Sequence, residues 1–455
     1  MTVAPASPDA APGAVGFDAV IGQGPAAEAL RRAVANDEVG HAFLLVGPPG
    51  VGQQHLVRAL AAGLNCPMLG DDGRPCGTCS ACVRIGRGSH PAVVTFAPVG
   101  VNHLVEPVRN VWIPTASRTL VDGTRRVIHV VAADRMNEAA QNAFLKVLEE
   151  PPASTVWVLD ATTTDPLLDT IVSRCRRVDL RAWGRADLRT HAESLGVDDQ
   201  EVLRVLVRAS QGSPTRLAGF VNDLWEWSCP ACEQVVRLHG VPTARPPTHC
   251  TNRKCDSVKA GEPAPLARRA VDETARHRHL TVVARFASQG AAAVGRVARE
   301  VTDWASARAG AVAAEHEAEK ARLADSAGVE AFTKLPKGVK TPVEQRHKRE
   351  VRQANVEAVT AFLDDFGSSL RDLVTMAAGG DADDLVNLDM AAQLRDDARL
   401  VPASAALGAM SELAAARESV LVHSGQPQLQ VEAVLMPIFV QVFRTQHHAT
   451  TSSQT

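Results

Sequence analysis

Residues 43–54 constrain the fold of this chain more than any other stretch. The apolar run 43–46 leads into a loop that contains Gly47, Gly50 and Gly52, and the residues after this loop have the pattern of a helix. A strand, a glycine-rich loop and a helix in this order form the phosphate-binding P-loop, whose bare backbone approaches a phosphate closely. A chance Gly-Pro turn is the alternative, and the helix that follows makes it the weaker interpretation.

Two positions of this loop carry the wrong side chains for ATP chemistry. Gln53 stands where a P-loop has the lysine that reaches the β- and γ-phosphates, and Gln54 stands where it has the hydroxyl that holds Mg²⁺. A neutral amide cannot supply the charge of the lysine, and a glutamine is a poor substitute for the hydroxyl. We therefore expect a loop that keeps the P-loop shape without its chemistry, and ATP binding is doubtful.

Eight of the nine cysteines fall into two groups of four. The groups are Cys66, Cys76, Cys79 and Cys82, and Cys229, Cys232, Cys250 and Cys255, while Cys175 stands alone. In a reducing compartment, C-x-x-C spacing is typical of metal sites, not of disulfides. Four thiolates can enclose Zn²⁺ at about 2.3 Å per bond, which leaves no position for water or substrate. We therefore expect two structural zinc ions, with free thiols as the alternative at the first group and His249 as an alternative ligand at the second.

Length and composition set further limits. With 455 residues, of which 45% are hydrophobic, the chain can form about three domains with buried cores. A formal net charge of −3 neither favours nor excludes a nucleic-acid partner, because only a local patch would matter. The Ala/Pro-rich start lacks the features of a signal peptide, and no apolar run of about 18 residues is present. We therefore expect a cytoplasmic protein without a membrane partner, with disordered tails at 1–15 and 446–455.

Strand and helix patterns alternate through the first part of the chain. The predicted strands are 41–46, 127–133, 155–161 and 178–180. Residues 137–149 have the apolar spacing of a helix, which two prolines end. This alternation is typical of a mostly parallel sheet with helices on both faces. We therefore expect an α/β domain over 16–180 that includes a zinc module at 66–82.

The remainder is predicted to be helical apart from one insertion. Residues 181–223 have the pattern of a small helical domain, and 263–445 is almost entirely helical by its apolar spacing. Between them, 224–262 carries the second cysteine group in the form of a zinc ribbon, together with Trp225 and Trp227. Its basic side chains are Arg237, Arg245, His249, Arg253, Lys254 and Lys259. The insertion is therefore a structural knob with its tryptophans in a small core, a DNA contact through stacked bases, or a protein contact.

The order of these motifs resembles the bacterial clamp-loader subunits of the AAA+ class. The P-loop and the first cysteine group are followed by 142–152, Asn-Ala-Phe-Leu-Lys-Val-Leu-Glu-Glu-Pro-Pro, and by Ser-Arg-Cys at 173–175. These two motifs together are highly specific for that family, and the likeness covers 16–223, but 345–440 only in a general way. The resemblance implies an α/β AAA+ module, a helical lid and a helical collar that assembles with sister subunits.

Within this family, the lost chemistry resembles the δ′ type and not the ATP-hydrolysing γ/τ type. The acidic pair of the γ/τ Walker B strand would fall at Val131 and Ala132, and Asp134 lies beyond the expected metal position. Without the lysine, the Mg²⁺ ligand and the acid pair, phosphoryl transfer loses both charge neutralisation and water activation. We therefore expect no hydrolysis by this chain alone, with weak docking of a nucleotide on the loop amides left open.

The resemblance gives Arg174 a role in trans. In this class, the Ser-Arg-Cys arginine reaches the ATP of a neighbouring subunit, where an arginine finger can raise the rate by about 10³–10⁵. The alternative is a surface arginine in a structural ion pair. Thr162 and Arg216 match the sensor and lid-arginine positions of the family, where structural and functional roles are equally open.

The resemblance therefore implies a stator-like subunit of the clamp loader that loads the sliding clamp of DNA polymerase III on primed DNA. The expected partners are the γ/τ and δ subunits in a hetero-oligomer and, through them, the sliding clamp and primer–template DNA. One alternative is an active γ/τ-type ATPase, against which the substituted P-loop and Walker B positions argue. The other is a zinc-ribbon protein that binds nucleic acid, and it would require the basic insertion to dominate.

Overall fold

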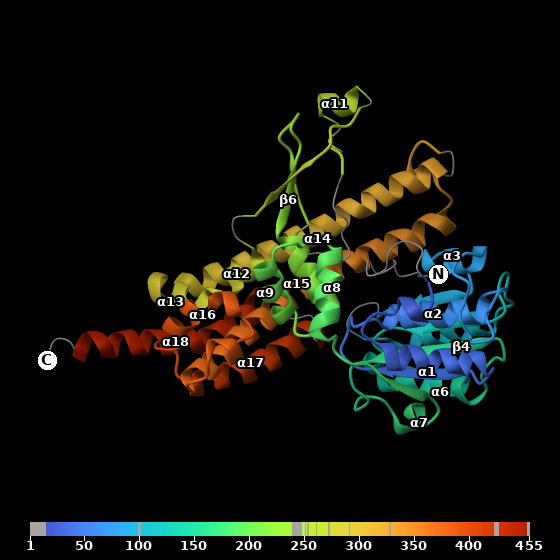
Figure 1. Cartoon of the computed structure of the whole chain (residues 1–455), viewed down its shortest axis with the longest axis horizontal. Coiled ribbons are helices and arrows are strands. Elements are labelled where there is room, and N and C mark those ends of the chain that lie inside the picture. Colours follow the sequence, from blue (N-terminus) through green and yellow to red (C-terminus); the bar gives the residue numbers. More distant parts are fainter. Residues whose placement is uncertain are drawn as a thin grey trace. The chain divides into compact units, whose positions relative to one another are not determined.

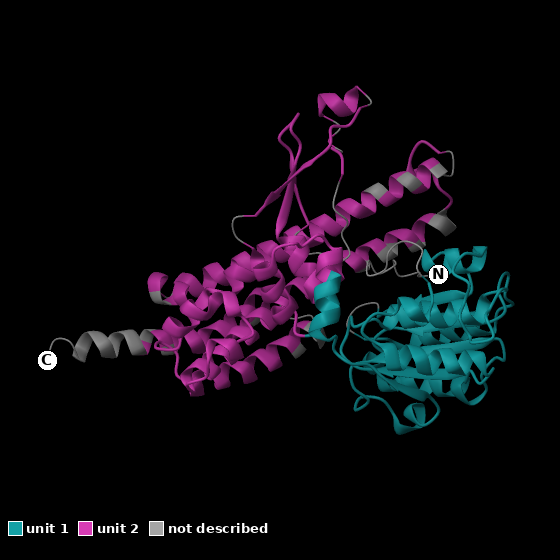
Figure 2. Ribbon diagram, in the orientation of Figure 1, with its two compact units in different colours: residues 1–191, 212–215 teal, residues 192–211, 216–455 magenta. Residues whose placement is uncertain are grey.

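The structure is a computed structural model that describes residues 15–98, 102–238, 248–250, 252, 254–260, 262–271, 274–290, 292–326, 329–422 and 427–452. The chain forms two compact units (Figure 2), which are residues 1–191 with 212–215, and residues 192–211 with 216–455. The tail expected at 1–15 lies outside the described residues except for Val15. Among the described residues, no helix has both the length and the apolar composition that crossing a membrane requires.

Unit 1 contains a five-stranded, wholly parallel sheet (Figure 1) in the order β2-β3-β4-β1-β5. The strands are β1 (Ala42–Val46), β2 (Val93–Phe96), β3 (Arg126–Val130), β4 (Thr155–Ala161) and β5 (Arg176–Asp179). All five residues of β1 and of β3 are buried, because a parallel sheet is covered on both faces, and this explains the continuous apolar run of β1. The predicted parallel α/β layout is therefore confirmed.

Two strands differ from the sequence prediction. Strand β3 ends at Val130 and not at 133, because Ala132 has a left-handed φ of 50°, which ends the extended backbone. The chain then enters the short helix η3 (Ala133–Arg135). Strand β2 is not predicted from the sequence, because a run of four residues carries too weak a periodic signal.

The helices of unit 1 surround this sheet. They are η1 (Phe17–Ala19), α1 (Gly24–Ala35), α2 (Gln53–Asn65), α3 (Ser80–Gly86), α4 (Val105–Pro107), η2 (Val108–Trp112), α5 (Ile113–Ser117), α6 (Glu138–Glu149) and α7 (Asp169–Val172). Helix α8 (Arg185–Ser194) begins in unit 1 and ends in unit 2. Asn137 begins α6, because its side-chain oxygen accepts a hydrogen bond from the Ala140 N–H at 2.8 Å. Phe144 of α6 packs edge-on against Trp157 of β4 with ring centroids 4.8 Å apart, which fixes this helix on the sheet.

Unit 2 is mainly helical, as predicted. Its helices are α9 (Gln200–Ala209), α10 (Pro214–Asp223), α11 (Asp256–Lys259), α12 (Ala275–Leu280), α13 (Val282–Gln289), α14 (Ala292–Ser326), η4 (Phe332–Lys334), α15 (Lys337–Ala377), η5 (Ala382–Asp384), η6 (Leu388–Met390), α16 (Ala391–Asp397), α17 (Ala403–Val422) and α18 (Pro427–Ser452). Phe362, Phe366 and Leu370 of α15 are fully buried in the core of this unit. Helix α18 includes residues 446–452 of the tail expected at 446–455.

The insertion forms a small antiparallel sheet in unit 2. Its strands are β6 (Trp225–Ser228), β7 (Val235–Arg237) and β8 (Ala267–Ala270), in the order β7-β6-β8. Strand β8 lies after the boundary expected at 262, so this sheet continues further along the chain than the cysteine spacing indicates. Trp227 is buried in a small cluster with Leu238, Trp225 and residues of α14, and the Arg268 guanidinium lies 4.2 Å from the centre of the Trp225 ring. These contacts favour the interpretation of the insertion as a structural knob with its tryptophans in a small core.

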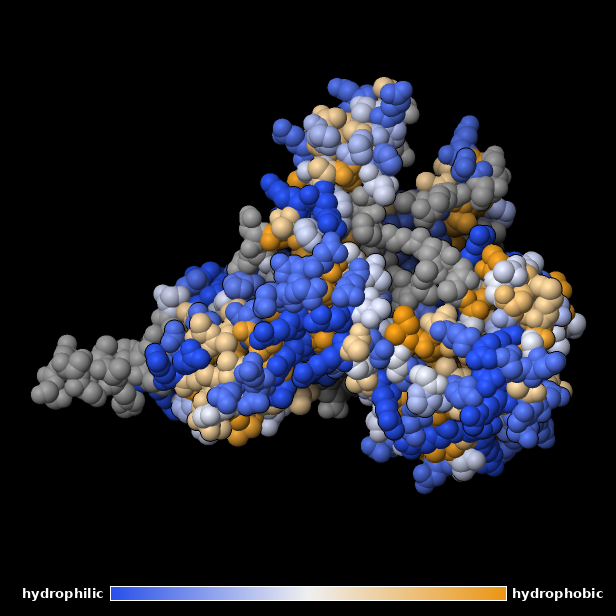
Figure 3. Space-filling model, in the orientation of Figure 1, coloured by the Kyte–Doolittle hydropathy of each residue, from blue (hydrophilic) through white to orange (hydrophobic). Residues whose placement is uncertain are grey.

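Hydrophilic and hydrophobic side chains are interspersed on the surface of both units (Figure 3). Large exposed apolar residues of unit 1 include Met68 and Val121, whose exposed fractions are 57% and 96%. Single exposed apolar residues of this kind are ordinary on a protein surface and need no partner.

Replacing Phe144 by Ala should destabilise unit 1 strongly. The side chain is fully buried between α6 and the sheet, and the resulting cavity should cost about 3–5 kcal/mol in the free energy of unfolding. The control is Val121→Ala at an exposed position, which should change that free energy by less than about 0.5 kcal/mol. Urea unfolding followed by tryptophan fluorescence measures both. Equal stabilities of the two variants would contradict this packing.

Candidate nucleotide loop and metal centres

Glycines shape the loop between β1 and α2. Gly50 and Gly52 have φ angles of 73° and 118°, which side-chain-bearing residues rarely adopt. A Cβ atom on Gly47 would lie 2.5 Å from the Leu180 carbonyl oxygen, so this position also requires glycine. The Thr215 hydroxyl donates a hydrogen bond to the Gly50 carbonyl at 3.0 Å. The three glycines predicted from the sequence therefore shape the loop.

Gln53 turns its side chain back into this loop. Its Nε2 atom donates to the Pro48 carbonyl at 2.7 Å, and its Oε1 atom accepts from the Val51 N–H at 3.0 Å. The residue is buried, with an exposed fraction of 8%. In an active P-loop, backbone N–H groups of the loop cradle the phosphates. Here the carboxamide of Gln53 takes one of those donors, and the half-buried Gln54 follows it on α2.

The carbonyl of Val51 is also engaged. It accepts hydrogen bonds from Gln23 Nε2 at 3.0 Å and from Trp183 Nε1 at 2.8 Å. Gln23 donates to the Arg181 carbonyl at 2.6 Å and accepts from the Arg181 N–H at 3.1 Å. Sequence reasoning does not find these links, because Gln23 and Trp183 lie far from the loop in the chain and belong to no motif.

The end of β3 lacks the acidic pair of an ATPase, as the sequence indicates. The nearest carboxylate from a neighbouring strand is Asp160 of β4, whose Oδ2 lies 2.9 Å from His129 Nε2 and whose Oδ1 accepts from the Ala132 N–H. Asp134 accepts from the Thr162 N–H at 3.0 Å, and burial raises the pKa of the Asp134 carboxyl. Sequence reasoning misses Asp160, because a single acid inside an apolar strand carries no motif.

Thr162 and Arg216, which match the sensor and lid-arginine positions of the family, both make contacts within the chain. In unit 1, the Thr162 N–H donates a hydrogen bond to Asp134 Oδ2. In unit 2, Arg216 forms an ion pair of 2.6 Å with the buried Asp365, and its guanidinium lies 5.3 Å from the centre of the Phe220 ring. Each contact stays within its own unit.

Arg174 lies directly after α7 at the surface of unit 1. Its Nη1 atom donates to the Thr170 carbonyl and its Nη2 atom to Glu149 Oε1, both at 3.0 Å. The side chains of Arg174 and Glu149 are 36% and 52% exposed. The structural ion pair weighed from the sequence is therefore present. An exposed pair of this kind contributes only about 0–1 kcal/mol, so it does not hold the arginine firmly in place.

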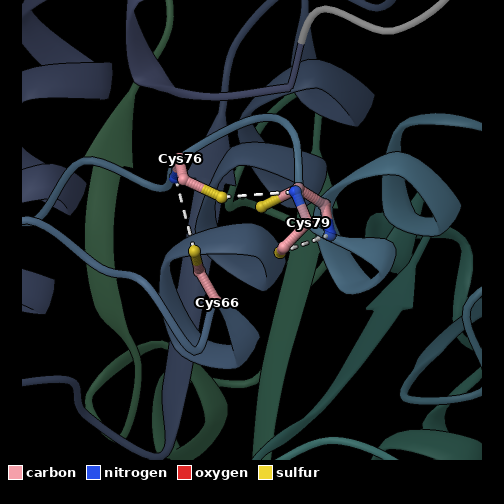
Figure 4. Close-up of side chains that lie close together, drawn as sticks. Cys66, Cys76 and Cys79 are labelled. Carbon is pink, nitrogen blue, oxygen red and sulfur yellow. Dashed lines mark hydrogen bonds between the residues drawn. The ribbon is translucent and has the colours of Figure 1, made fainter.

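The first cysteine group comes together after α2 (Figure 4). Figure 4 shows the side chains of Cys66, Cys76 and Cys79 close together. The Sγ atoms of these residues and of Cys82 lie within 4.8 Å of one another. The Cys79 N–H donates to Cys76 Sγ at 3.4 Å, and this bond, together with one from the Thr78 N–H, lowers the pKa of the Cys76 thiol to about 6. Four sulfurs this close together fit a tetrahedral Zn²⁺ ion, which binds cysteine as the thiolate.

The second cysteine group also converges. The Sγ atoms of Cys229, Cys232, Cys250 and Cys255 lie within 4.8 Å of one another. A hydrogen bond with the Ser257 hydroxyl lowers the pKa of the Cys255 thiol to about 6. His249 is exposed and is not part of this group, since its Nδ1 atom lies 3.1 Å from the Thr248 hydroxyl. The four cysteines therefore fit Zn²⁺ without a histidine. Arg245 and Arg253 lie outside the described residues.

Comparison with known proteins identifies relatives for the first part of the chain. Residues 22–183 match the family described as DNA polymerase III, delta subunit. The DNA polymerase III subunit δ′ of Haemophilus influenzae is 37% identical over 168 residues, which are 36% of this chain and 50% of that protein. The δ′ subunit of Escherichia coli is 34% identical over 220 residues, or 47% of this chain and 65% of that protein. The τ subunit of Bacillus subtilis is 30% identical over 207 residues, or 43% and 35%.

Replacing Cys79 by Ser should lower the zinc content of the purified chain by one equivalent, because three thiolates and a hydroxyl bind zinc less well than four thiolates. Cys232→Ser should do the same at the second group. Cys175→Ser is the control: burial raises the pKa of that lone thiol to about 12, and it belongs to neither group. Elemental analysis measures the metal content. Unchanged zinc in the first two variants would refute these assignments.

Proposed function

Because residues 22–183 make this chain a member of the clamp-loader family of DNA polymerase III subunits, in the δ′/γ/τ group, we propose that it is a δ′-type subunit. In this role it does not hydrolyse ATP and acts as a stator while the complex loads the sliding clamp on primed DNA. The chain spans 50–65% of the length of the two δ′ relatives, and its relatives include τ subunits. The choice between the types rests on the nucleotide loop.

The position of the Gln53 carboxamide is the observation that supports this choice most. The carboxamide accepts from the Val51 N–H and donates to the Pro48 carbonyl. A bound ATP would have to displace the carboxamide and break both hydrogen bonds. Each hydrogen bond contributes about 0.5–1.5 kcal/mol, and a nucleotide would gain no lysine charge and no Mg²⁺-binding hydroxyl in return. A filled loop of this kind fits a subunit that keeps the AAA+-like shape and leaves hydrolysis to its neighbours.

The residues beyond the loop favour the same function over an active γ/τ-type ATPase. Val131 and Ala132 provide no carboxylate at the end of β3. Asp134 accepts a hydrogen bond from the Thr162 N–H, and Asp160 is already engaged by His129 and the Ala132 N–H. The chain thus lacks the groups that neutralise the transferred phosphoryl group and position the attacking water.

Arg174 would then serve a neighbouring subunit. Its ion pair with Glu149 is exposed, so the guanidinium can turn toward the ATP of an adjacent ATPase at small cost. The partners in this proposal are the γ/τ and δ subunits in a hetero-oligomer, with the sliding clamp and primer–template DNA reached through the complex. The two cysteine clusters hold structural zinc.

The double variant Gln53→Lys with Gln54→Thr should bind ATP at least about tenfold more tightly than the wild type, because it frees the Val51 N–H and adds a charged donor. It should still not hydrolyse ATP, because the acid pair is missing. Gln53→Ala is the control that empties the loop without adding charge, and it should gain less. Titration with a fluorescent ATP analogue measures all three. A wild type that binds as tightly as the double variant would contradict the filled loop.

In a complex reconstituted with γ/τ and δ subunits, Arg174→Ala should reduce the ATPase rate in the presence of clamp and primed DNA by at least about tenfold. The matched control is Arg177→Ala, which removes another exposed arginine three residues away. The wild-type chain alone should be inactive. Turnover by the chain alone would refute the non-hydrolysing function, and equal rates for both variants would refute the trans role of Arg174.

A further inference from the structure

Helices α9, α10 and α12 and the short helix η6 line a pocket in unit 2. Its volume is about 630 Å³, a size typical of ligand pockets. The apolar part of its wall is formed by Val202, Val205, Phe220, Leu224 and Leu388. Each of these five side chains is only half-buried, so the pocket offers apolar surface that a ligand can cover.

The arginines of this pocket already have partners. The buried Arg276 donates through Nη1 and Nη2 to the two carboxylate oxygens of Asp389, at 2.6 and 2.9 Å. Its Nη2 atom also donates to Asn387 Oδ1 at 2.8 Å. Arg204 is exposed, and its Nη2 atom lies 3.9 Å from a carboxylate oxygen of Asp383. The buried guanidinium is therefore neutralised, which makes the pocket a poor site for an anion.

Two acids of the pocket, Asp223 and Glu201, are not neutralised in this way. The Ala275 N–H donates to Asp223 Oδ2 at 2.5 Å, and Oδ1 has no hydrogen-bond partner among the described residues. Burial raises the pKa of the Asp223 carboxyl to about 6, although that hydrogen bond, His279 and Arg278 act in the opposite direction. Glu201 is exposed, and no described residue forms an ion pair with it. A half-buried carboxylate beside apolar walls favours a cationic ligand.

We propose that this pocket binds a lysine side chain in an apolar segment of a partner protein. The aliphatic stem of the lysine covers Phe220 and Leu224, and its ammonium group donates to Asp223 Oδ1, while Glu201 adds a second negative charge. A lysine side chain has this form, because its stem is apolar and its charge is at the tip. The site does not depend on the proposed function.

The hydrogen bonding of Asp223 favours lysine over arginine. A guanidinium binds a carboxylate best through both oxygens at once, whereas an ammonium group is a compact charge that one oxygen can accept. Here the Ala275 N–H already occupies Oδ2, so only Oδ1 is left for the ligand. The pocket therefore matches a point charge at the end of an apolar stem.

Peptide binding to the full-length chain tests the pocket. The probe is the peptide Ala-Leu-Lys-Leu-Ala with an uncharged fluorophore, and its counterpart carries acetyl-lysine, which keeps the stem and removes the charge. Fluorescence anisotropy should show that the wild type binds the lysine peptide at least about tenfold more tightly than its counterpart. Asp223→Asn should abolish this preference, because it removes the charge and keeps an oxygen that accepts from the Ala275 N–H. Glu201→Gln, at an exposed position, should weaken binding of the lysine peptide about two- to fivefold.

The matched control is Asp198→Asn, which removes the same charge from an exposed side chain outside the pocket and should bind like the wild type. Circular dichroism checks that all variants are folded. The proposal is overturned if the wild type does not bind the lysine peptide, binds both peptides equally, or binds a glutamate peptide more tightly. It is also overturned if Asp198→Asn loses as much affinity as Asp223→Asn. Dissociation of a dimer by Asp223→Asn in sedimentation would make a second copy of this chain the occupant and would overturn the partner protein.

Discussion

Hydrogen bonds at Val51 join three segments of unit 1 at the loop between β1 and α2. The N–H of this buried residue is taken by the Gln53 side chain, and its carbonyl is shared by Gln23, from the segment before α1, and Trp183, from the segment after β5. Three parts of the chain that are distant in sequence therefore meet at one residue. In an ATPase the loop at this place must stay open for phosphate. Here the protein satisfies the loop with its own side chains, which stabilises the fold and removes a phosphate-binding donor.

In the proposed function, this arrangement lets one chain lose the chemistry of its own site and still serve an ATPase complex. The Gln53 carboxamide is bonded within the loop, both oxygens of Asp160 are bonded to His129 and the Ala132 N–H, and one oxygen of Asp134 accepts from the Thr162 N–H. Arg174 differs, because it lies at the surface in an exposed ion pair. A rigid inner site and a releasable outer arginine are what a stator requires, since it must keep its shape while a neighbour hydrolyses ATP.

Features encoded by short spacings could be predicted from the sequence, and features that join distant segments could not. The glycine loop, the parallel α/β layout and both cysteine groups depend on local patterns, and the structure agrees with them. The strand order, the link from Trp183 to Val51 and the pairing of β8 with β6 depend on which segments meet in three dimensions. The contact between His316 of α14 and His347 of α15 also joins distant segments, because each histidine lies in a charged stretch that alone looks like a solvated helix.

Hydrogen exchange at the Val51 amide is the most direct test of the filled loop. If the Gln53 carboxamide holds this N–H, the amide should exchange slowly in the free chain, and added ATP with Mg²⁺ should leave its rate unchanged. Gln53→Ala should accelerate exchange at this amide. Fast exchange in the free wild-type chain that slows when ATP is added would show that the loop is open and binds nucleotide, and it would contradict a loop closed by Gln53.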